Sequence, residues 1–264
     1  MNETETTFCE VLGCQRLSLY LNKDYSLSKE ESVTLSLYLK RRALGEPLQY
    51  ILGKSEFMGL TFKVTPEVLI PRPETEVLVE TALNLVRKFV SSKVRKLKIL
   101  DLGTGSGCVA VSLAKFLPEA KTYASDISAG ALEVAKENAA SNNVSIEFIQ
   151  SDLFSHCGLW TMDYGLIISN PPYIPGSEIT KLQPEIQYEP RAALDGGSDG
   201  LTFFRRIIKE SLGYLTGGGL LIMEIGFGQA KEIKNIFQNY PDFRIIETVR
   251  DYSGIERVIV AKKY

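Results

Sequence analysis

The sequence is poor in side chains that bind metals. It has a single histidine, His156, and four scattered cysteines, which are Cys9, Cys14, Cys108 and Cys157. A zinc site needs paired ligands at short spacing, and Cys9 with Cys14 cannot supply four of them. We therefore expect no metal and interpret His156 as incidental. Free thiols in a chain of 264 residues favour a reducing cytosol.

Targeting signals and a basic surplus are also missing. The first ten residues, MNETETTFCE, contain neither a basic start nor an apolar run, so they do not form a secretory signal. No apolar run is long enough to span a bilayer, and we expect a soluble, cytoplasmic protein without membrane contact. The net charge is −2 and the pI is about 5.7, which favours a protein or small-molecule substrate over nucleic acid.

Residues 1–53 carry a helical pattern. Ser28 and Glu31 have the spacing of a capping box, which predicts that a helix starts there. This helix should end near the basic triplet at 40–42, because a glycine and a proline follow it. The triplet is either a solvated helix end or a patch that binds a partner.

Two short β-like runs come next. Residues 60–64 and 67–70 are split by Thr65-Pro66, and this pattern predicts a hairpin. We assign residues 54–73 to a hairpin linker and residues 74–264 to a catalytic domain.

From residue 74 onward, helical patterns alternate with apolar strands. Only a short RDYSGI stretch joins the last two strands, so these two should be antiparallel. The pattern predicts an α/β fold of the class I methyltransferase type: a seven-stranded, mostly parallel, doubly wound sheet with an antiparallel last strand. The predicted strands are residues 97–103, 121–127, 146–152, 164–170 and 219–226, followed by FRIIETV and ERVIVAKK.

A glycine-rich loop follows the first strand of this sheet. Glycines let the backbone pass close to a ligand, and the next helix offers unpaired N–H groups. The spacing is G-x-G-x-G, with Cys108 where the third glycine of a dinucleotide fingerprint would stand. This spacing is typical of S-adenosylmethionine sites, and we expect that cofactor. The loop residues are Gly103, Thr104, Gly105, Ser106 and Gly107.

Acidic residues end the next two strands. Asp126 can accept hydrogen bonds from both ribose hydroxyls, and Asp152 can accept one from the adenine amino group. The alternative is that both residues only cap a helix or a turn. Their position near the glycine loop favours the cofactor site.

The tetrapeptide Asn170-Pro171-Pro172-Tyr173 ends the fourth strand and should face the same crevice. Consecutive prolines fix the backbone and remove two donors, which leaves the Asn170 side-chain oxygen and the Pro171 carbonyl as acceptors. These acceptors match the two donors of a planar NH2 group. Methyl transfer to such a nitrogen then depends on positioning, without a general base, and Tyr173 can pack on the amide plane.

Together these motifs resemble amino-methyltransferases that act on planar NH2 groups. Four further segments closely resemble release factor glutamine methyltransferases, the PrmC or HemK family. The likeness extends over nearly the whole chain from about residue 28 onward. The segments are residues 45–53, 69–76, 189–201 and 250–260.

This resemblance implies methylation of the side-chain amide N5 of the glutamine in the Gly-Gly-Gln motif of class I release factors. It implies that residues 103–107, Asp126, Asp152 and Asn170 hold the cofactor and that 170–173 hold the substrate glutamine. Leu153 stands where the family often has tryptophan, so apolar packing should replace an aromatic stack on adenine.

The resemblance also makes Arg72 and Glu74 secondary candidates, although a capped helix start explains them equally well. The first helix of the family is expected to be absent or truncated. We expect residues 1–53 to dock the release factor, while the irregular stretch 174–200 closes over the substrate loop.

Three alternative functions stay open. The first is glutamine N5-methylation of a ribosomal protein, and the second is adenine-N6 methylation of nucleic acid. An adenine methyltransferase must flip its base and usually adds a recognition region, for which this chain has little room. The third is a non-catalytic module that binds the cofactor.

Overall fold

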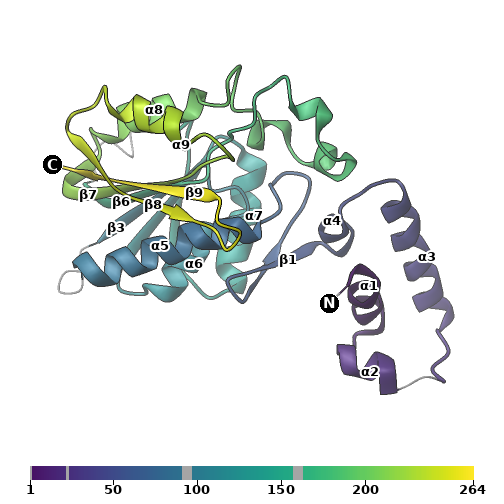
Figure 1. Cartoon of the computed structure of the whole chain (residues 1–264). Coiled ribbons are helices and arrows are strands. Elements are labelled where there is room, and N and C mark those ends of the chain that lie inside the picture. Colours follow the sequence, from purple (N-terminus) through teal and green to yellow (C-terminus); the bar gives the residue numbers. More distant parts are fainter. Residues whose placement is uncertain (1, 22–23, 91–96, 157–162) are drawn as a thin grey trace.

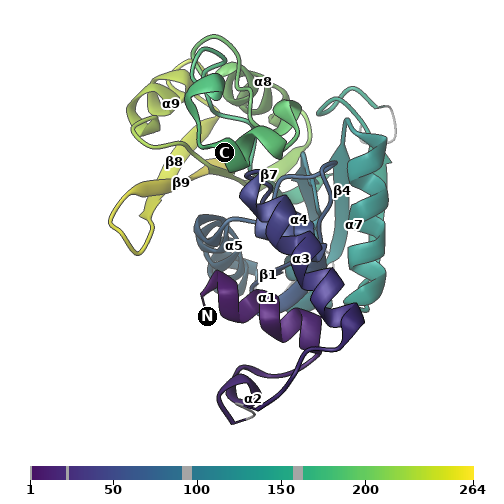
Figure 2. The ribbon, with the colours of Figure 1, turned by 90° about the vertical axis from the view of Figure 1, so that its right-hand side faces the viewer.

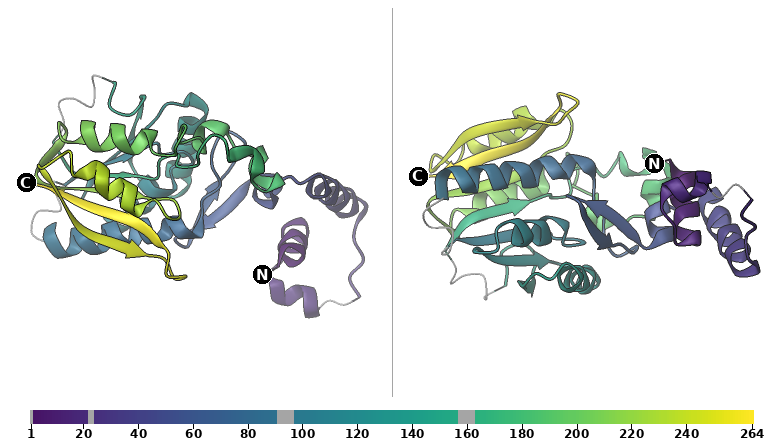
Figure 3. Two further views of the ribbon diagram at one scale, coloured as in Figure 1. Left: turned by 45° about the horizontal axis from the view of Figure 1, so that its top comes forward. Right: turned by 90° about the horizontal axis from the view of Figure 1, so that it is seen from below.

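A computed structural model describes residues 2–21, 24–90, 97–156 and 163–264, so Cys157 lies outside the described residues. The first three helices of the N-terminal region stand apart from a central sheet, which helices cover on both faces (Figure 1). Figure 3 shows the N-terminal region at the opposite end of the molecule from the C-terminus.

The N-terminal region is helical, as predicted. Its helices are α1 Glu3–Leu12, α2 Arg16–Leu21, α3 Lys29–Ala43 and α4 Leu48–Leu52. The predicted capping box starts α3: Ser28 Oγ accepts from the Glu31 amide at 3.1 Å, and the Glu31 carboxylate accepts from the Ser28 amide at 2.7 Å. Figure 2 views this region from its outer side, with α3 and α1 toward the viewer.

A hairpin joins this region to the sheet, but the predicted hairpin was wrong in position. The strands are β1 Lys54–Phe57 and β2 Leu60–Lys63. Met58 and Gly59 both have positive φ, as a two-residue hairpin turn requires. Residues 67–70 form no strand, because the backbone turns at Thr65 and the Ile70 amide bonds to a glutamate instead of a neighbouring strand. The sequence of this segment has the apolar pattern of a strand because Val68 and Ile70 pack into the core.

The described residues contain a seven-stranded sheet in the order β5-β4-β3-β6-β7-β9-β8. Its strands are β3 Lys98–Leu102, β4 Lys121–Asp126, β5 Ile146–Gln150, β6 Tyr164–Ser169, β7 Leu215–Glu224, β8 Phe243–Arg250 and β9 Glu256–Lys263. Strand β9 is antiparallel to both of its neighbours, while the pairs among β3 to β7 are parallel. The predicted fold class is confirmed, including the antiparallel last pair.

Helices cover both faces of the sheet. They are α5 Pro73–Val90, α6 Cys108–Phe116, α7 Ala129–Ser141, α8 Thr202–Ser211 and α9 Ala230–Phe237. Adjacent residues of the central strands point into opposite cores: Ile99 packs with α5 and α6, whereas Leu100 packs with α8 and α9. A strand buried on both faces is a continuous apolar run, which is why the sequence pattern was clear.

Strand β7 departs from its predicted bounds. It begins at Leu215, four residues before the predicted start at 219, and Leu215 pairs with Tyr164. The pairing register then shifts between Tyr164 and Leu166, and three glycines at 217–219 lie within this part of β7. Glycines in a strand commonly mark such a bulge.

The irregular segment between β6 and α8 contains three short 3-10 helices. They are η3 Ile179–Lys181, η4 Pro184–Tyr188 and η5 Arg191–Ala193. An isolated bridge between Ile174 and Asp195 closes the segment back on itself. It is therefore an ordered structure that borders the carboxyl end of the sheet.

Candidate functional site

A cavity of about 440 Å³ lies at the carboxyl ends of β3, β4 and β6. This size is in the range of small-molecule sites, and open α/β sheets bind ligands at this edge. Most of the predicted site residues line it: Gly103, Thr104, Gly105, Ser106, Asp126, Asp152, Leu153, Asn170, Pro171 and Pro172. Gly107 and Tyr173 are not among its lining residues. No helix among the described residues is long and apolar enough to cross a membrane.

The glycine loop presents backbone to this cavity. Gly103 and Gly105 have φ of 70° and 54°, and a Cβ at either position would meet no atom within 4 Å. Positive φ therefore explains these glycines, and the open space beside them leaves the backbone accessible to a ligand. Gly107 also has a positive φ, of 81°, and in addition its Cβ would lie 3.0 Å from the side chain of Ala135. It therefore also permits close packing against α7.

Asp126 supports the loop as well as lining the cavity. One carboxylate oxygen accepts from the Gly105 amide at 2.8 Å, and the other accepts from the Ser128 amide at 2.9 Å. The capping interpretation of Asp126 is therefore correct for the protein alone. Each oxygen has a further lone pair, so the same carboxylate can accept from ribose hydroxyls.

Asp101 is a site residue that was not predicted. It lines the cavity and accepts a hydrogen bond of 2.6 Å from the Thr104 hydroxyl. Burial raises the pKa of Asp101 to about 7, and the bond from Thr104 opposes that rise. Its position at the end of β3, two residues before the glycine loop, was the available signal.

Asp152 forms an ion pair with a residue of helix α8. Asp152 Oδ1 lies 2.9 Å from Arg206 Nη1, and Arg206 and Phe203 also line the cavity. Leu153 is buried beside them and has a positive φ of 49°. This wall is apolar around one ion pair, which fits the expected apolar packing at Leu153.

Asn170 is held by a residue of α5. Its side-chain nitrogen donates to the Thr75 hydroxyl at 3.1 Å. No described residue donates a hydrogen bond to its side-chain oxygen. The predicted acceptor is thus available at the cavity.

Tyr173 is fixed from two sides. Its carbonyl accepts from Gln229 Nε2 at 2.9 Å, and its hydroxyl donates to Glu224 Oε1 at 3.4 Å. A Cβ on Gly200 would lie 2.4 Å from the Tyr173 carbonyl oxygen, so only glycine fits there. The structure thus accounts for Gly200, which belongs to the 189–201 segment.

Two of the distant motifs meet beside the cavity. Arg72 forms an ion pair with Glu189, and the second oxygen of Glu189 accepts from the Ile70 amide at 3.2 Å. The Glu189 side chain is only 1% exposed. Arg72 lines the cavity, but its guanidinium is used to neutralise a buried carboxylate. The secondary candidate Glu74 is not a lining residue.

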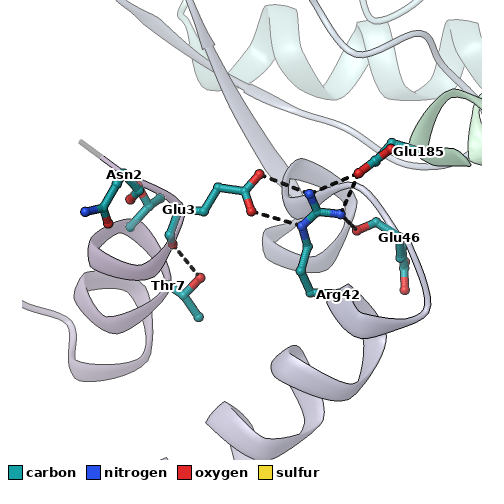
Figure 4. Close-up of polar contacts among 7 residues, drawn as sticks. Asn2, Glu3, Thr7, Arg42, Glu46 and Glu185 are labelled. Carbon is teal, nitrogen blue, oxygen red and sulfur yellow. Dashed lines mark hydrogen bonds and ion pairs between the residues drawn. The ribbon is translucent and has the colours of Figure 1, made fainter. Parts of the chain in front are cut away.

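The basic triplet is largely paired within the chain. Arg41 bonds to Glu46 at 2.5 and 2.7 Å. Figure 4 shows the Arg42 guanidinium between Glu3 of α1 and Glu185 of η4, at 3.0 to 3.2 Å. The side chains of Arg41 and Arg42 are 35% and 29% exposed, so this helix end is partly solvated and also paired within the chain. Arg42 ties the helical region to the segment that borders the cavity.

A second contact strengthens this connection. The Tyr188 hydroxyl donates to the Leu44 carbonyl at 2.9 Å. Tyr50 of α4 donates to the Val68 carbonyl at 2.6 Å and packs with Ala131 and Val134 of α7. Helix α4 is thus packed into the sheet domain, although it precedes residue 53.

Comparisons with known proteins identify the family. A release factor glutamine methyltransferase of Geobacter sulfurreducens is 45% identical over 97% of this chain and 87% of its own length. The chain belongs to the release factor glutamine methyltransferase family. A second member, from Thermodesulfovibrio yellowstonii, is 42% identical over 100% of this chain and 92% of its own length. The predicted family and enzyme class are confirmed.

Two family models match this chain, and a solved methyltransferase structure shares its fold. The methyltransferase small domain matches residues 76–199, and the PrmC N-terminal domain matches residues 1–53. The T. thermophilus 16S rRNA N2 G1207 methyltransferase, solved with AdoMet and guanosine, has a TM-score of 0.57 at 17% identity. The match covers 80% of this chain and 50% of that one, and it shows the shared fold.

Proposed function

We propose that this protein transfers a methyl group from S-adenosylmethionine to the side-chain amide N5 of the glutamine in the Gly-Gly-Gln motif of class I release factors. The Asn170 side chain carries this proposal. Its NH2 group is held by Thr75, so its oxygen is available at a cavity that the glycine loop also lines. Relatives that carry this activity in their names align with nearly the whole chain.

Some residues around the cavity would hold the cofactor, and others would hold the substrate amide. The loop at 103–107, together with Asp126, Asp152 and Leu153, would hold the cofactor, whose sulfonium supplies an electrophilic methyl group. Asn170 Oδ1 and the Pro171 carbonyl would accept from the substrate NH2 group and fix its nitrogen toward that methyl. No side chain has to remove a proton first, because the amide proton becomes acidic once the nitrogen is methylated.

Recognition of the release factor needs a second surface. We assign it to the helical region, residues 1–53, with 54–73 as linker and 74–264 as catalytic domain. On α3, Val33 and Leu37 are 63% and 52% exposed, and neighbouring side chains of that helix leave a shallow groove. Exposed apolar patches of this kind commonly mark protein contacts. The bonds of Arg42 and Tyr188 would transmit docking to the segment beside the cavity.

Methyl transfer from labelled cofactor tests the proposed function. Intact release factor, ribosomal protein and DNA are offered separately to the full-length protein. We expect label in the release factor, and loss of that label when its Gly-Gly-Gln glutamine is replaced. Label confined to ribosomal protein or to DNA would establish one of the alternative substrates instead.

A further inference from the structure

A buried carboxylate lies behind the Asn-Pro-Pro-Tyr motif. Glu224 is the last residue of β7 and is 1% exposed. Its Oε2 is buried without a hydrogen-bond partner among the described residues. Burying a carboxylate is unfavourable unless it is compensated, so a position like this calls for a reason beyond packing.

Glu224 contacts one end of the motif directly and adjoins the residue that holds the other end. The Tyr173 hydroxyl donates to Glu224 Oε1 at 3.4 Å. Thr75, which is 2% exposed, accepts from the Asn170 side-chain nitrogen at 3.1 Å. The Thr75 hydroxyl is close enough to Glu224 to lower the pKa of that carboxyl. One carboxyl group therefore adjoins Tyr173 itself and Thr75, the partner of Asn170.

The direction of these hydrogen bonds matters for the chemistry. A threonine hydroxyl can donate or accept, so Thr75 alone cannot choose between the two orientations of the Asn170 amide. An ionised carboxylate can only accept. If Thr75 gives its proton to Glu224, it can only accept from Asn170, and the Asn170 oxygen must then face the cavity.

We propose that Glu224 is a positioning residue which, through Thr75, fixes the Asn170 amide with its oxygen toward the substrate. In the flipped orientation, Asn170 would present N–H groups to a substrate NH2 group, and donor would meet donor. The Tyr173 contact holds the other end of the motif in register. A further effect is cooperative, because a chain of bonds ending at a carboxylate makes the Asn170 oxygen a stronger acceptor.

The proposal links turnover to the ionisation of Glu224. Burial raises the pKa of Glu224 to about 7, and Thr75, Arg257 and Tyr173 oppose that rise. Glu74 on α5 raises the pKa further, and Cys108 on α6 also interacts with this carboxyl. A protonated Glu224 can donate to Thr75 and release the constraint. Turnover should therefore fall as the pH drops through about 7.

Kinetics of Glu224→Gln and Thr75→Val test the positioning role, which rests on the proposed function. A glutamine amide can donate to Thr75, and valine removes the hydroxyl at equal size. We expect kcat to fall about 10- to 100-fold in each, with cofactor Kd within about threefold of wild type. Glu224→Gln should also lose the decline of kcat near pH 7. Thr75→Ser should recover most of the turnover lost in Thr75→Val.

The matched control is Thr81→Val on the same helix. Among the residues that the structure describes, the Thr81 hydroxyl bonds to the Val77 carbonyl alone, at 2.7 Å, so its loss should leave kcat unchanged. Equal losses in Thr75→Ser and Thr75→Val would indicate packing and overturn the proposal. An unchanged kcat and pH profile in Glu224→Gln would also overturn it.

A readout without substrate separates this proposal from the proposed function. In ¹⁵N-labelled protein, the Asn170 side-chain amide signal is identified by its absence in Asn170→Ala. We expect this signal to shift with pH around 7 in the wild type and to stay constant in Glu224→Gln. A signal that titrates equally in both proteins would contradict the relay, whatever the substrate is.

Discussion

The helical N-terminal region and the sheet domain are stabilised in different ways. Central strands such as β3 and β6 are almost fully buried, with side chains at 0% exposure from Leu166 to Ile168. Helices α2 and α3 instead expose many apolar side chains, and Arg42 of α3 forms partly exposed ion pairs with Glu3 and Glu185. The sheet domain thus has a complete core of its own, whereas the helical region leaves apolar surface that a protein partner could cover.

The largest expected effect lies in the sheet domain. Asn170→Ala removes the substrate acceptor, and we expect kcat to fall about 100- to 1,000-fold, as for loss of a single preorganised hydrogen-bonding group. Cofactor affinity measured by calorimetry should change far less than kcat, because Asn170 is only one of several residues expected to hold the cofactor. The exposed Asn239→Ala is the control. Near-normal turnover in Asn170→Ala would contradict the acceptor mechanism.

The Arg72→Ala variant tests whether Arg72 stabilises the fold or binds substrate. Arg72→Ala leaves the buried Glu189 carboxylate unpaired, which should destabilise the fold by about 2–4 kcal/mol. Arg191→Ala removes an exposed pair with Asp195, and its cost should stay within about 0.5 kcal/mol. Denaturant unfolding measures both. A stable Arg72→Ala protein with no activity would instead assign Arg72 to substrate binding.

Asp126 should matter to the cofactor more than to the fold. Asp126→Ala removes the carboxylate that accepts from the Gly105 and Ser128 amides, as well as the predicted ribose contact. We expect cofactor binding to weaken by about 1–3 kcal/mol in calorimetry. Asp242→Ala, at an exposed position away from the cavity, is the control. Unchanged cofactor affinity in Asp126→Ala would remove Asp126 from the site.

The smallest effect is expected where the two regions meet. Arg42→Ala breaks a partly exposed ion pair to Glu185, which is worth at most about 1 kcal/mol. We expect KM for intact release factor to rise about two- to fivefold at low salt, with kcat unchanged. Arg16→Ala breaks a pair inside the helical region alone and should leave KM unchanged. Equal effects in both variants would show that the bridge to Glu185 has no special role.

Local patterns predicted much of the fold and of the cofactor site, because strands buried on both faces and a glycine loop are visible in short windows of sequence. The hairpin was misplaced because residues 67–70 are as apolar as a strand, while their backbone bonds elsewhere. Arg72 with Glu189, and Thr75 with Glu224, were not predicted as partners. Those pairs form only when distant segments fold together, and no local spacing encodes them.

The central claim is that the helical region docks the release factor while the sheet domain carries out methyl transfer, and kinetics can test it directly. Val33→Ser/Leu37→Ser removes the apolar surface of α3, and Phe116→Ser/Ile246→Ser is a matched change of exposed residues in the sheet domain. We measure kcat/KM on intact release factor and on a free Gly-Gly-Gln peptide. We predict that the α3 variant loses about tenfold or more on the intact factor, none on the peptide, and that the control loses nothing. Equal kcat/KM for wild type and the α3 variant on the intact factor would contradict docking by the helical region.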